Sequence, residues 1–358
     1  MEKEHINYST FEVAQRKSKE LEADIAVNPH KYRVLTGDRP TGNLHIGHYF
    51  GSLCNRVKIQ NLGVETYIVI ADYQVLTDRD AFDRISEFVY ELTIDYLACG
   101  LDPEKHKTYI FPHSYVPELN QLLLPFLTLV SNSELERNPT IKEEIAASGQ
   151  KSVNAGMYVY PVHQAADILF CKSNIVPVGK DQLPHIELTR NIARRFNTKY
   201  KAQVFREPFG LLSDTPLILG LDGGQKMSKS RNNSIAIKAT ADETQKMIKT
   251  AKTDSERLIT YDPDNRPEVA NLLRLASLCS GKTPETIASE IGEGGARLLK
   301  ETVTEALNEY FAPIRRRRAE LENDRAYIRS ILENGIVQAR QAALETLNDV
   351  RQAMNMIL

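Results

Sequence analysis

Two histidines and a glycine near the start of the chain have the residue types and spacing to hold a nucleotide. His45 and His48 are three positions apart and share a face if the segment is helical, and Gly47 leaves that face bare between them. A helix start also offers backbone N–H groups and the positive end of the helix dipole. The segment therefore suits phosphates on the imidazoles and a base against the glycine. Alone, it also fits a glycine-rich strand-to-helix turn with two surface histidines.

A second segment, Gly220–Asn233, has the composition of a mobile anion clamp. Lys226 and Lys229 are three positions apart and are accompanied by the hydroxyls of Ser228 and Ser230. The glycine pair at positions 223–224 precedes them. A lysine on a flexible loop is a mobile positive charge that can follow a phosphate during a reaction. A basic surface loop would explain either lysine alone.

A third set of polar residues lies on one face of a predicted helix. Tyr160, Gln164 and Asp167 follow one another at i, i+4 and i+7 among alanine, isoleucine and leucine. A buried carboxylate is costly unless it is paired. Asp167 is therefore either a ligand-binding group or half of a structural salt bridge, and the spacing leaves both interpretations open.

The elements that would position these residues alternate between strand and helix. This rhythm predicts an α/β fold with a Rossmann-like, doubly wound parallel sheet. Ligands of such sheets bind beyond the carboxyl ends of the strands, where Thr36–His48 and Asp72–Gln74 would lie. The first predicted strand ends at Val34–Leu35. The other predicted strands cover Thr66–Asp72, Thr108–Phe111 and Ile175–Val178.

Beyond Ile235 the pattern is almost entirely helical, which predicts an all-helical C-terminal domain. We expect three parts: an N-terminal helical extension over residues 1–30, a catalytic domain over 31–235 with a helical insertion at about 118–165, and a helical domain over 236–358. The extension is interpreted as a packing or dimer-contact element. Four consecutive arginines, Arg315–Arg318, spread around a helix and suit either RNA phosphate or a solvated face.

Composition limits the partners and the compartment. The net charge of −2 requires any nucleic acid to be met by local basic patches. No apolar run is long enough to span a bilayer and no secretory signal is present, so we expect a cytoplasmic protein without a membrane partner. The cysteines are Cys54, Cys99, Cys171 and Cys279, and none lies within metal-binding spacing of another. This spacing predicts reduced thiols and no protein metal site.

His45-Ile-Gly-His48 and Lys226-Met-Ser-Lys-Ser230, in this order around an α/β pattern, resemble the two signature motifs of class I aminoacyl-tRNA synthetases. Within that class the closer resemblance is to the tryptophanyl family, and it covers nearly the whole chain from Arg33 onward. The segments that carry it are Thr36–His48, Glu134–Thr140, Ala165–Leu169, Ile175–Gln182 and His185–Ala193.

The resemblance implies a reaction and a set of partners. L-tryptophan and ATP would give tryptophanyl-adenylate and pyrophosphate, and the tryptophanyl group would pass to the 3′-terminal adenosine of tRNA(Trp). Catalysis would consist of positioning and charge stabilisation, without a protein nucleophile. Mg²⁺ would arrive with ATP rather than in a protein cage. The helical domain would read the anticodon, and the assembly would be a homodimer.

The resemblance also assigns roles residue by residue. The catalytic residues would be His45, His48, Lys226 and Lys229. The nucleotide would be bound by Arg39, Pro40, Thr41, Gly47, His48, Gly179, Lys180, Asp181, Leu217, Lys226, Met227, Ser228, Lys229 and Ser230. Tryptophan would be bound by Leu35, Gln74, Tyr160, Gln164, Asp167, Val176, Val178 and Gln182.

Substrate choice rests on particular positions of this set. Asp167 matches the carboxylate that accepts the indole N–H, and Val176 and Val178 match residues that line the indole pocket. The related tyrosyl family carries a tyrosine where this chain has Leu35. The chain departs from the tryptophanyl pattern at Gln164, where methionine is common.

Three other interpretations are weighed against this one. Leu35 argues against a tyrosyl synthetase. The complete motifs argue against a synthetase-derived binding or regulatory protein without aminoacylation activity. The large helical region argues against a smaller nucleotidyltransferase that shares only the first motif.

Overall fold

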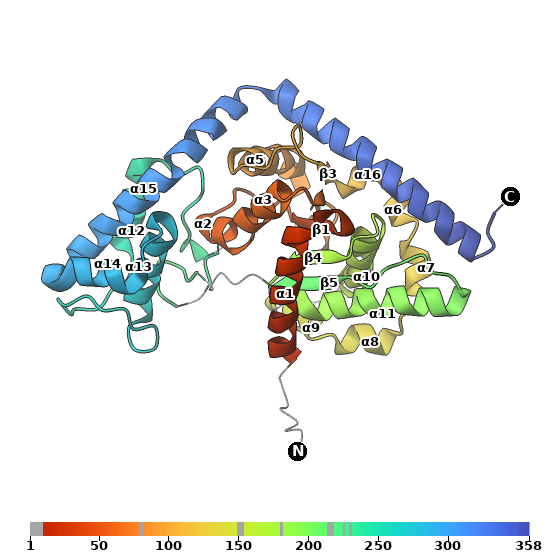
Figure 1. Ribbon diagram of the computed structural model, residues 1–358, viewed down its shortest axis with the longest axis horizontal. Coiled ribbons are helices and arrows are strands. Elements are labelled where there is room, and N and C mark those ends of the chain that lie inside the picture. Colours follow the sequence, from red (N-terminus) through yellow and green to blue (C-terminus); the bar gives the residue numbers. More distant parts are fainter. Residues whose placement is uncertain are drawn as a thin grey trace, which may run out of the picture.

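The computed structural model describes residues 10–78, 82–148, 154–179, 182–212, 218–224, 226–228 and 231–357. Its centre is a five-stranded parallel sheet in the order β3-β2-β1-β4-β5, with helices on both faces (Figure 1). The predicted α/β class is confirmed. The strands are β1 Arg33–Asp38, β2 Glu65–Ile70, β3 Thr108–Pro112, β4 Ile175–Val178 and β5 Phe209–Leu212.

Three details of the sheet differ from the sequence-based expectation. Val34 and Leu35 lie near the beginning of β1 rather than at its end. Gly37, interpreted as part of a loop, lies inside the strand opposite Val69, and a Cβ there would be 1.9 Å from the Val69 carbonyl oxygen. The glycine therefore permits a close approach of β1 and β2. The short strand β5, which contains Gly210, was not predicted.

The helices of the first half of the chain connect and cover the strands. They are α1 Thr10–Val27, α2 Ile46–His48, η2 Tyr49–Leu53, α3 Cys54–Asn61, α4 Val75–Asp78, α5 Ile85–Ala98, α6 Pro117–Asn120, α7 Leu123–Leu127, α8 Asn132–Arg137, α9 Pro139–Ser148, α10 Ala155–Leu169 and α11 Leu183–Tyr200.

Alternate residues of the strands face opposite layers, as strand geometry requires. On one face, Leu35 and Val176 share a buried cluster with residues of α10 and α11. On the other face, Val34 and Ile175 share a cluster with Ile25 of α1. The Ser18 hydroxyl of α1 also accepts a hydrogen bond from the Leu212 N–H of β5 at 2.9 Å. The N-terminal helix therefore covers the β4–β5 side of the sheet.

From α12 onward the described elements are helices, and one long helix returns to the sheet. Figure 1 shows α15 and α16 meeting at an angle, with α16 running beside β3. The domain boundaries placed at residues 30 and 235 stay predictions. The helices are α12 Ala241–Thr250, α13 Pro267–Ser280, α14 Pro284–Ile291, α15 Gly295–Glu322 and α16 Arg325–Ala353.

Buried charge joins α15 to α5. Arg318 is 2% exposed and its Nε donates to Asp95 at 2.7 Å, while its other nitrogens pair with Glu91 and Glu322. One member of the predicted arginine run is thus committed to an internal ion pair. Among the residues that the structure describes, no helix has both the length and the apolar character needed to cross a bilayer.

The contact of α16 with β3 predicts the effect of one substitution. A Cβ on Gly335 would lie 1.9 Å from the Ile110 carbonyl oxygen. Since neither backbone can yield without moving the helix, Gly335→Ala is expected to lower the free energy of unfolding by about 1–3 kcal/mol. Urea denaturation would measure this. Val337→Ala, at a 61% exposed position of the same helix, is the control and should change little. Equal stability of Gly335→Ala and the wild type would contradict this packing.

Candidate active site

A cavity of about 820 Å³ opens at the carboxyl ends of β1 and β4. This is where the strand order reverses, the position at which doubly wound sheets bind ligands. Of the residues assigned from the sequence, the cavity is lined by Leu35, Arg39, His45, Gly47, His48, Gln74, Tyr160, Gln164, Asp167, Val176, Val178, Gly179, Gln182, Lys226 and Met227.

The remaining assigned residues fall into two groups. Pro40, Thr41 and Ser228 are described but do not line this cavity. The others lie outside the described residues: Lys180, Asp181, Leu217, Lys229 and Ser230.

Backbone hydrogen bonds join the two motif segments, although they are far apart in sequence. The Ile46 N–H donates to the Ile235 carbonyl at 3.0 Å, and the Ile237 N–H donates to the Leu44 carbonyl at 2.9 Å. These bonds flank an antiparallel bridge between His45 and the chain just after the lysine-rich segment. The first motif therefore serves as an anchor for the end of the second.

Side chains reinforce this junction. Met227 is 2% exposed and packs over Gly47, where an added Cβ would be 3.3 Å from the Met227 Cβ and 3.0 Å from His45 Nδ1. Gly47 therefore keeps the contact between the motifs close. Lys226, next to the buried methionine, is exposed and lines the cavity.

The two imidazoles of the first motif lie against one another. Their ring centroids are 3.7 Å apart, with planes tilted by 33°. The His45 backbone N–H donates to His48 Nδ1 at 3.2 Å, so the proton of a neutral His48 ring is on Nε2. An Nε2–H is a donor of the kind that a phosphate oxygen requires.

Asn233, which ends the second segment, fastens that loop. Its Oδ1 accepts the Ser228 N–H at 2.8 Å, and its Nδ2 donates to both carboxylate oxygens of Asp222. A Cβ on Gly220 would lie 2.0 Å from the same Nδ2. An asparagine at the end of a glycine-rich loop is a frequent turn-closing residue, and this is the sequence signal for the role of Asn233 seen here.

Below the first motif the cavity is lined by a buried ion pair that the sequence did not reveal. Arg56 is 4% exposed and donates to Asp38 Oδ2 at 2.6 Å, and the Tyr96 hydroxyl donates to the same oxygen at 2.7 Å. Burial acts against the charge of Asp38, but Arg56 outweighs it and lowers the pKa to about 2. Asp38 stays ionised and ties β1 to α3 and α5.

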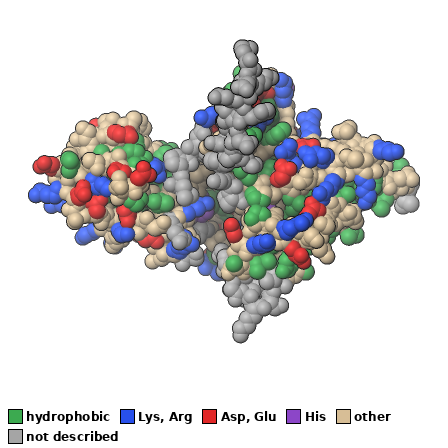
Figure 2. Space-filling view, turned by 90° about the horizontal axis from the view of Figure 1, so that it is seen from below, with side chains coloured by type: hydrophobic (Ala, Val, Ile, Leu, Met, Phe, Trp, Pro, Cys, Tyr) green, Lys and Arg blue, Asp and Glu red, His purple; other side chains and the backbone are tan. Residues whose placement is uncertain are grey.

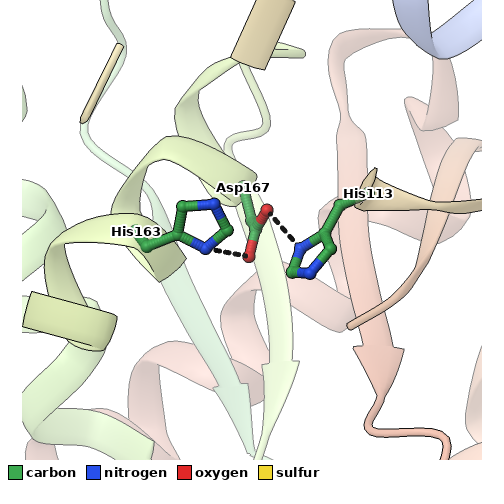
Figure 3. Close-up of side chains that lie close together, drawn as sticks. All are labelled: His113, His163 and Asp167. Carbon is green, nitrogen blue, oxygen red and sulfur yellow. Dashed lines mark hydrogen bonds and ion pairs between the residues drawn. The ribbon is translucent and has the colours of Figure 1, made fainter. Parts of the chain in front are cut away.

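Asp167 is buried and partnered within the protein, and it also lines the cavity. It is 2% exposed, and its Oδ2 accepts the Gln74 Nε2–H at 3.3 Å. Oδ1 lies 3.1 Å from His113 Nδ1, and Oδ2 lies 3.9 Å from His163 Nδ1 (Figure 3). Burial opposes ionisation, yet the neighbouring imidazoles and hydrogen bonds hold the pKa of Asp167 below its ordinary value.

His113, His163 and Asp167 bring three possible metal-ligand atoms within 4.8 Å of one another. The proton positions favour a different use. The Tyr73 N–H donates to His113 Nε2 at 2.8 Å, which places the ring proton on Nδ1 and aims it at Asp167. An Nδ1–H cannot coordinate a cation, so the arrangement is a hydrogen-bonded carboxylate.

Sequence reasoning did not find these two histidines. His163 precedes Asp167 by four residues on the same helix, which is a recognisable signal. His113 follows β3 and belongs to the carboxyl edge of the sheet, the edge at which ligand sites form. That placement was the available signal for His113.

Comparisons with known proteins agree with this geometry. Residues 28–312 match the family described as "tRNA synthetases class I (W and Y)". A tryptophan–tRNA ligase of Clostridium longisporum is 41% identical over 329 residues, which cover 90% of this chain and 96% of that protein. A tryptophan–tRNA ligase of Treponema pallidum is 39% identical over 331 residues, which cover 90% of this chain and 97% of that protein.

Solved structures give the same result. The tryptophanyl-tRNA synthetase of Campylobacter jejuni, complexed with ADP and tryptophan, superposes with a TM-score of 0.79 at 31% identity and covers 90% of this chain and 99% of that one. A tyrosyl-tRNA synthetase of Archaeoglobus fulgidus has a TM-score of 0.65 at 22% identity, covers 84% of this chain and 95% of that one, and shares the fold. The resemblance seen in the sequence is confirmed: this chain belongs to the class I tRNA synthetases of the tryptophan and tyrosine family.

Proposed function

We propose that this chain attaches L-tryptophan to tRNA(Trp) through a tryptophanyl-adenylate. As a member of its family the chain is an ATP-dependent tRNA synthetase. The observation that carries the choice of tryptophan is one cavity lined both by the two motif segments and by the buried, ionised Asp167. This arrangement supports a nucleotide site beside an acceptor for a ring N–H.

In the first step a carboxylate oxygen of tryptophan attacks the α-phosphate of ATP. A bond forms between that oxygen and the phosphorus, and the bond to the bridging oxygen breaks as pyrophosphate leaves with the electron pair. His45 and His48 donate to the phosphates, and Lys226 and Lys229 neutralise the departing pyrophosphate. Gly47 admits the adenine. The exposed Lys226 on a chain anchored at both ends supports this arrangement.

Tryptophan selection rests on the other end of the cavity. Asp167 accepts the indole N–H, and Leu35 and Val176 give an apolar surface for the rings. Tyr160 and Gln182 meet the substrate ammonium group. A ligand without a ring N–H would leave the carboxylate without this donor, which is a strong source of discrimination.

Mg²⁺ enters with ATP. Among the described residues lining the cavity, only Asp38 and Asp167 carry carboxylates, and each is engaged by protein donors. The cavity therefore offers the cation no obvious protein cage, which fits an ion held by the phosphates and water.

In the second step a terminal hydroxyl of the tRNA attacks the carbonyl carbon of the adenylate, and AMP leaves. The helical region would bind the RNA. Two of the four consecutive arginines, Arg315 and Arg318, are engaged in internal contacts. Arg316 and Arg317 are exposed and line a hollow where α15 meets α16. On the face seen in Figure 2, basic and acidic side chains are interspersed, so RNA would be met by local groups of this kind.

We also propose a homodimer that works in the cytoplasm, where its proposed substrates ATP and tRNA are found. Large apolar side chains stand exposed on elements that follow β2 and β3, which supports a contact on this side of the molecule. They are Tyr73, Leu76, Tyr115 and Leu124.

The lysine loop is tested by Lys229→Ala. We expect ATP–pyrophosphate exchange to fall by about 10²–10³-fold, because one charge on the leaving pyrophosphate is lost. Tryptophan binding, measured by calorimetry, should survive. Lys105→Ala is the control, since Lys105 is 79% exposed and pairs with Asp102. Exchange at the wild-type rate in Lys229→Ala would show that the loop assignment is wrong.

The pocket is tested by Asp167→Ala. Loss of a hydrogen bond to a charged acceptor predicts a tryptophan Kd raised by about tenfold or more. Calorimetry gives the Kd, and exchange assays with tryptophan and tyrosine side by side give the selectivity, which should decline. An unchanged tryptophan affinity would refute the role of Asp167.

The RNA surface is tested by the double change of Arg316 and Arg317 to Gln. We expect weaker tRNA binding and a shallower dependence of log K on log salt, by about one unit for each phosphate that the variant no longer neutralises. The pyrophosphate exchange rate should not change. An unaltered tRNA affinity and salt slope would remove these arginines from the RNA surface.

A further inference from the structure

His113 lies behind the cavity and takes no part in the proposed reaction. It is fully buried, in the turn η4 His113–Tyr115 that follows β3, and it does not line the cavity. Both of its ring nitrogens nevertheless have partners on elements that do line it. Such a residue can act on the substrate only through the groups that it holds.

The first partner is the carboxylate of Asp167 on α10. The His113 Nδ1–H donates to Oδ1 at 3.1 Å. This bond leaves Oδ2, which accepts from the cavity-lining Gln74, as the oxygen on the cavity side. The ring therefore fixes which oxygen of Asp167 is turned toward a ligand.

The second partner is the backbone just before Gln74. The Tyr73 N–H donates to His113 Nε2 at 2.8 Å. Gln74 follows directly in the chain, and its amide returns to Asp167. These hydrogen bonds form a closed network of the imidazole, the carboxylate, the glutamine amide and the Tyr73–Gln74 backbone. The network joins the ends of β2 and β3 to α10.

We propose that His113 is a positioning residue for the recognition of a ring N–H: it holds Asp167 and the Tyr73–Gln74 backbone together, so that the second carboxylate oxygen is presented to the indole of tryptophan. The proposal rests on the function proposed above for Asp167. The ring suits this task because its Nδ1–H aims a directional donor at one carboxylate oxygen and leaves the other, Oδ2, as an acceptor. Burial opposes a charge on the ring, but Asp167 and Asp72, whose Oδ1 lies 3.3 Å from Nε2, outweigh it and raise the pKa of His113.

The neighbouring His163 offers a matched control. Its ring centroid lies 5.0 Å from that of His113. Its Nε2 donates to Asn120 Oδ1 at 2.7 Å, and burial lowers its pKa, so Nδ1 carries no proton to give to Asp167. The 3.9 Å separation of that Nδ1 from Oδ2 is also too long for a hydrogen bond. His163 therefore shares the surroundings of His113 and faces the same carboxylate, but makes no hydrogen bond to it.

The experiment compares tryptophan with its benzothiophene analogue, in which sulfur replaces the indole N–H. Calorimetry gives the Kd of each ligand for the full-length wild type, His113→Ala, His113→Asn, His113→Gln and His163→Ala. The asparagine amide reproduces the donor of Nδ1 toward Asp167, whereas the glutamine carbonyl reproduces the acceptor of Nε2 toward Tyr73. ATP KM and kcat at saturating tryptophan are recorded alongside.

We expect His113→Ala to raise the tryptophan Kd by about tenfold to a hundredfold and to leave the analogue nearly unchanged, so that the preference for the N–H ligand collapses. ATP KM and kcat at saturation should stay near wild type. His113→Asn should restore much of the preference, His113→Gln should not, and His163→Ala should retain it. If the alanine variant unfolds, the contrast between the asparagine and glutamine variants decides the matter.

The outcomes distinguish the positioning role of His113 from the proposed role of Asp167 as the acceptor of the indole N–H. Equal binding of tryptophan and the sulfur analogue by the wild type would remove Asp167 as the N–H acceptor, and the proposed role of His113 with it. A wild type that discriminates, together with His113→Ala and His113→Gln variants that discriminate equally well, would refute only the positioning role. Equal losses of both ligands in every His113 variant would show a merely structural residue.

Discussion

The backbone pairing between residues 44–46 and 235–237 is the constraint on which one end of the cavity depends, the end lined by the two motif segments. The proposed reaction asks two things of the lysine-rich loop: freedom to follow a phosphate, and a fixed position to which its lysines return. The structure meets both requirements by anchoring the loop at its ends. Asn233 and the paired segment hold one side, and the buried Met227 holds the chain against Gly47. The exposed Lys226 directly precedes the buried Met227 in the chain.

Buried charge connects the elements around the cavity in a similar way. A buried ion left without a partner is strongly unfavourable, so each pair fixes the relative position of the elements that carry it. Asp38 with Arg56 ties the end of β1 to α3, and Arg318 with Asp95 ties α15 to α5. The end of the cavity that contains Asp167 differs, because this carboxylate is held by the His113 imidazole and the Gln74 amide. A carboxylate held in this way keeps acceptor capacity for a ligand.

Much of the arrangement could be predicted from the sequence, because its signals are local. Four parallel strands, the helix carrying Tyr160 and Asp167, and the two motif segments each leave a pattern within a short window. The resemblance between motifs then joined segments that periodicity alone could not relate. Strand β5 escaped prediction because Phe209–Leu212 is short, contains a glycine and lacks alternation, and it is stabilised by β4 and α1.

His113 and Arg56 could not be predicted because their importance lies in contacts between distant elements. Arg56 on α3 has the sequence surroundings of a surface helix residue, and only the tertiary fold buries it against Asp38. His113 has partners 40 and 54 residues away in sequence, at Tyr73 and Asp167. Long-range contacts of this kind leave no spacing to read in a single chain. The motif residues therefore predict the chemistry from the sequence alone. The residues proposed to position the ligand-binding groups, such as His113, are identified only in the folded structure, where the carboxyl ends of the strands lie together.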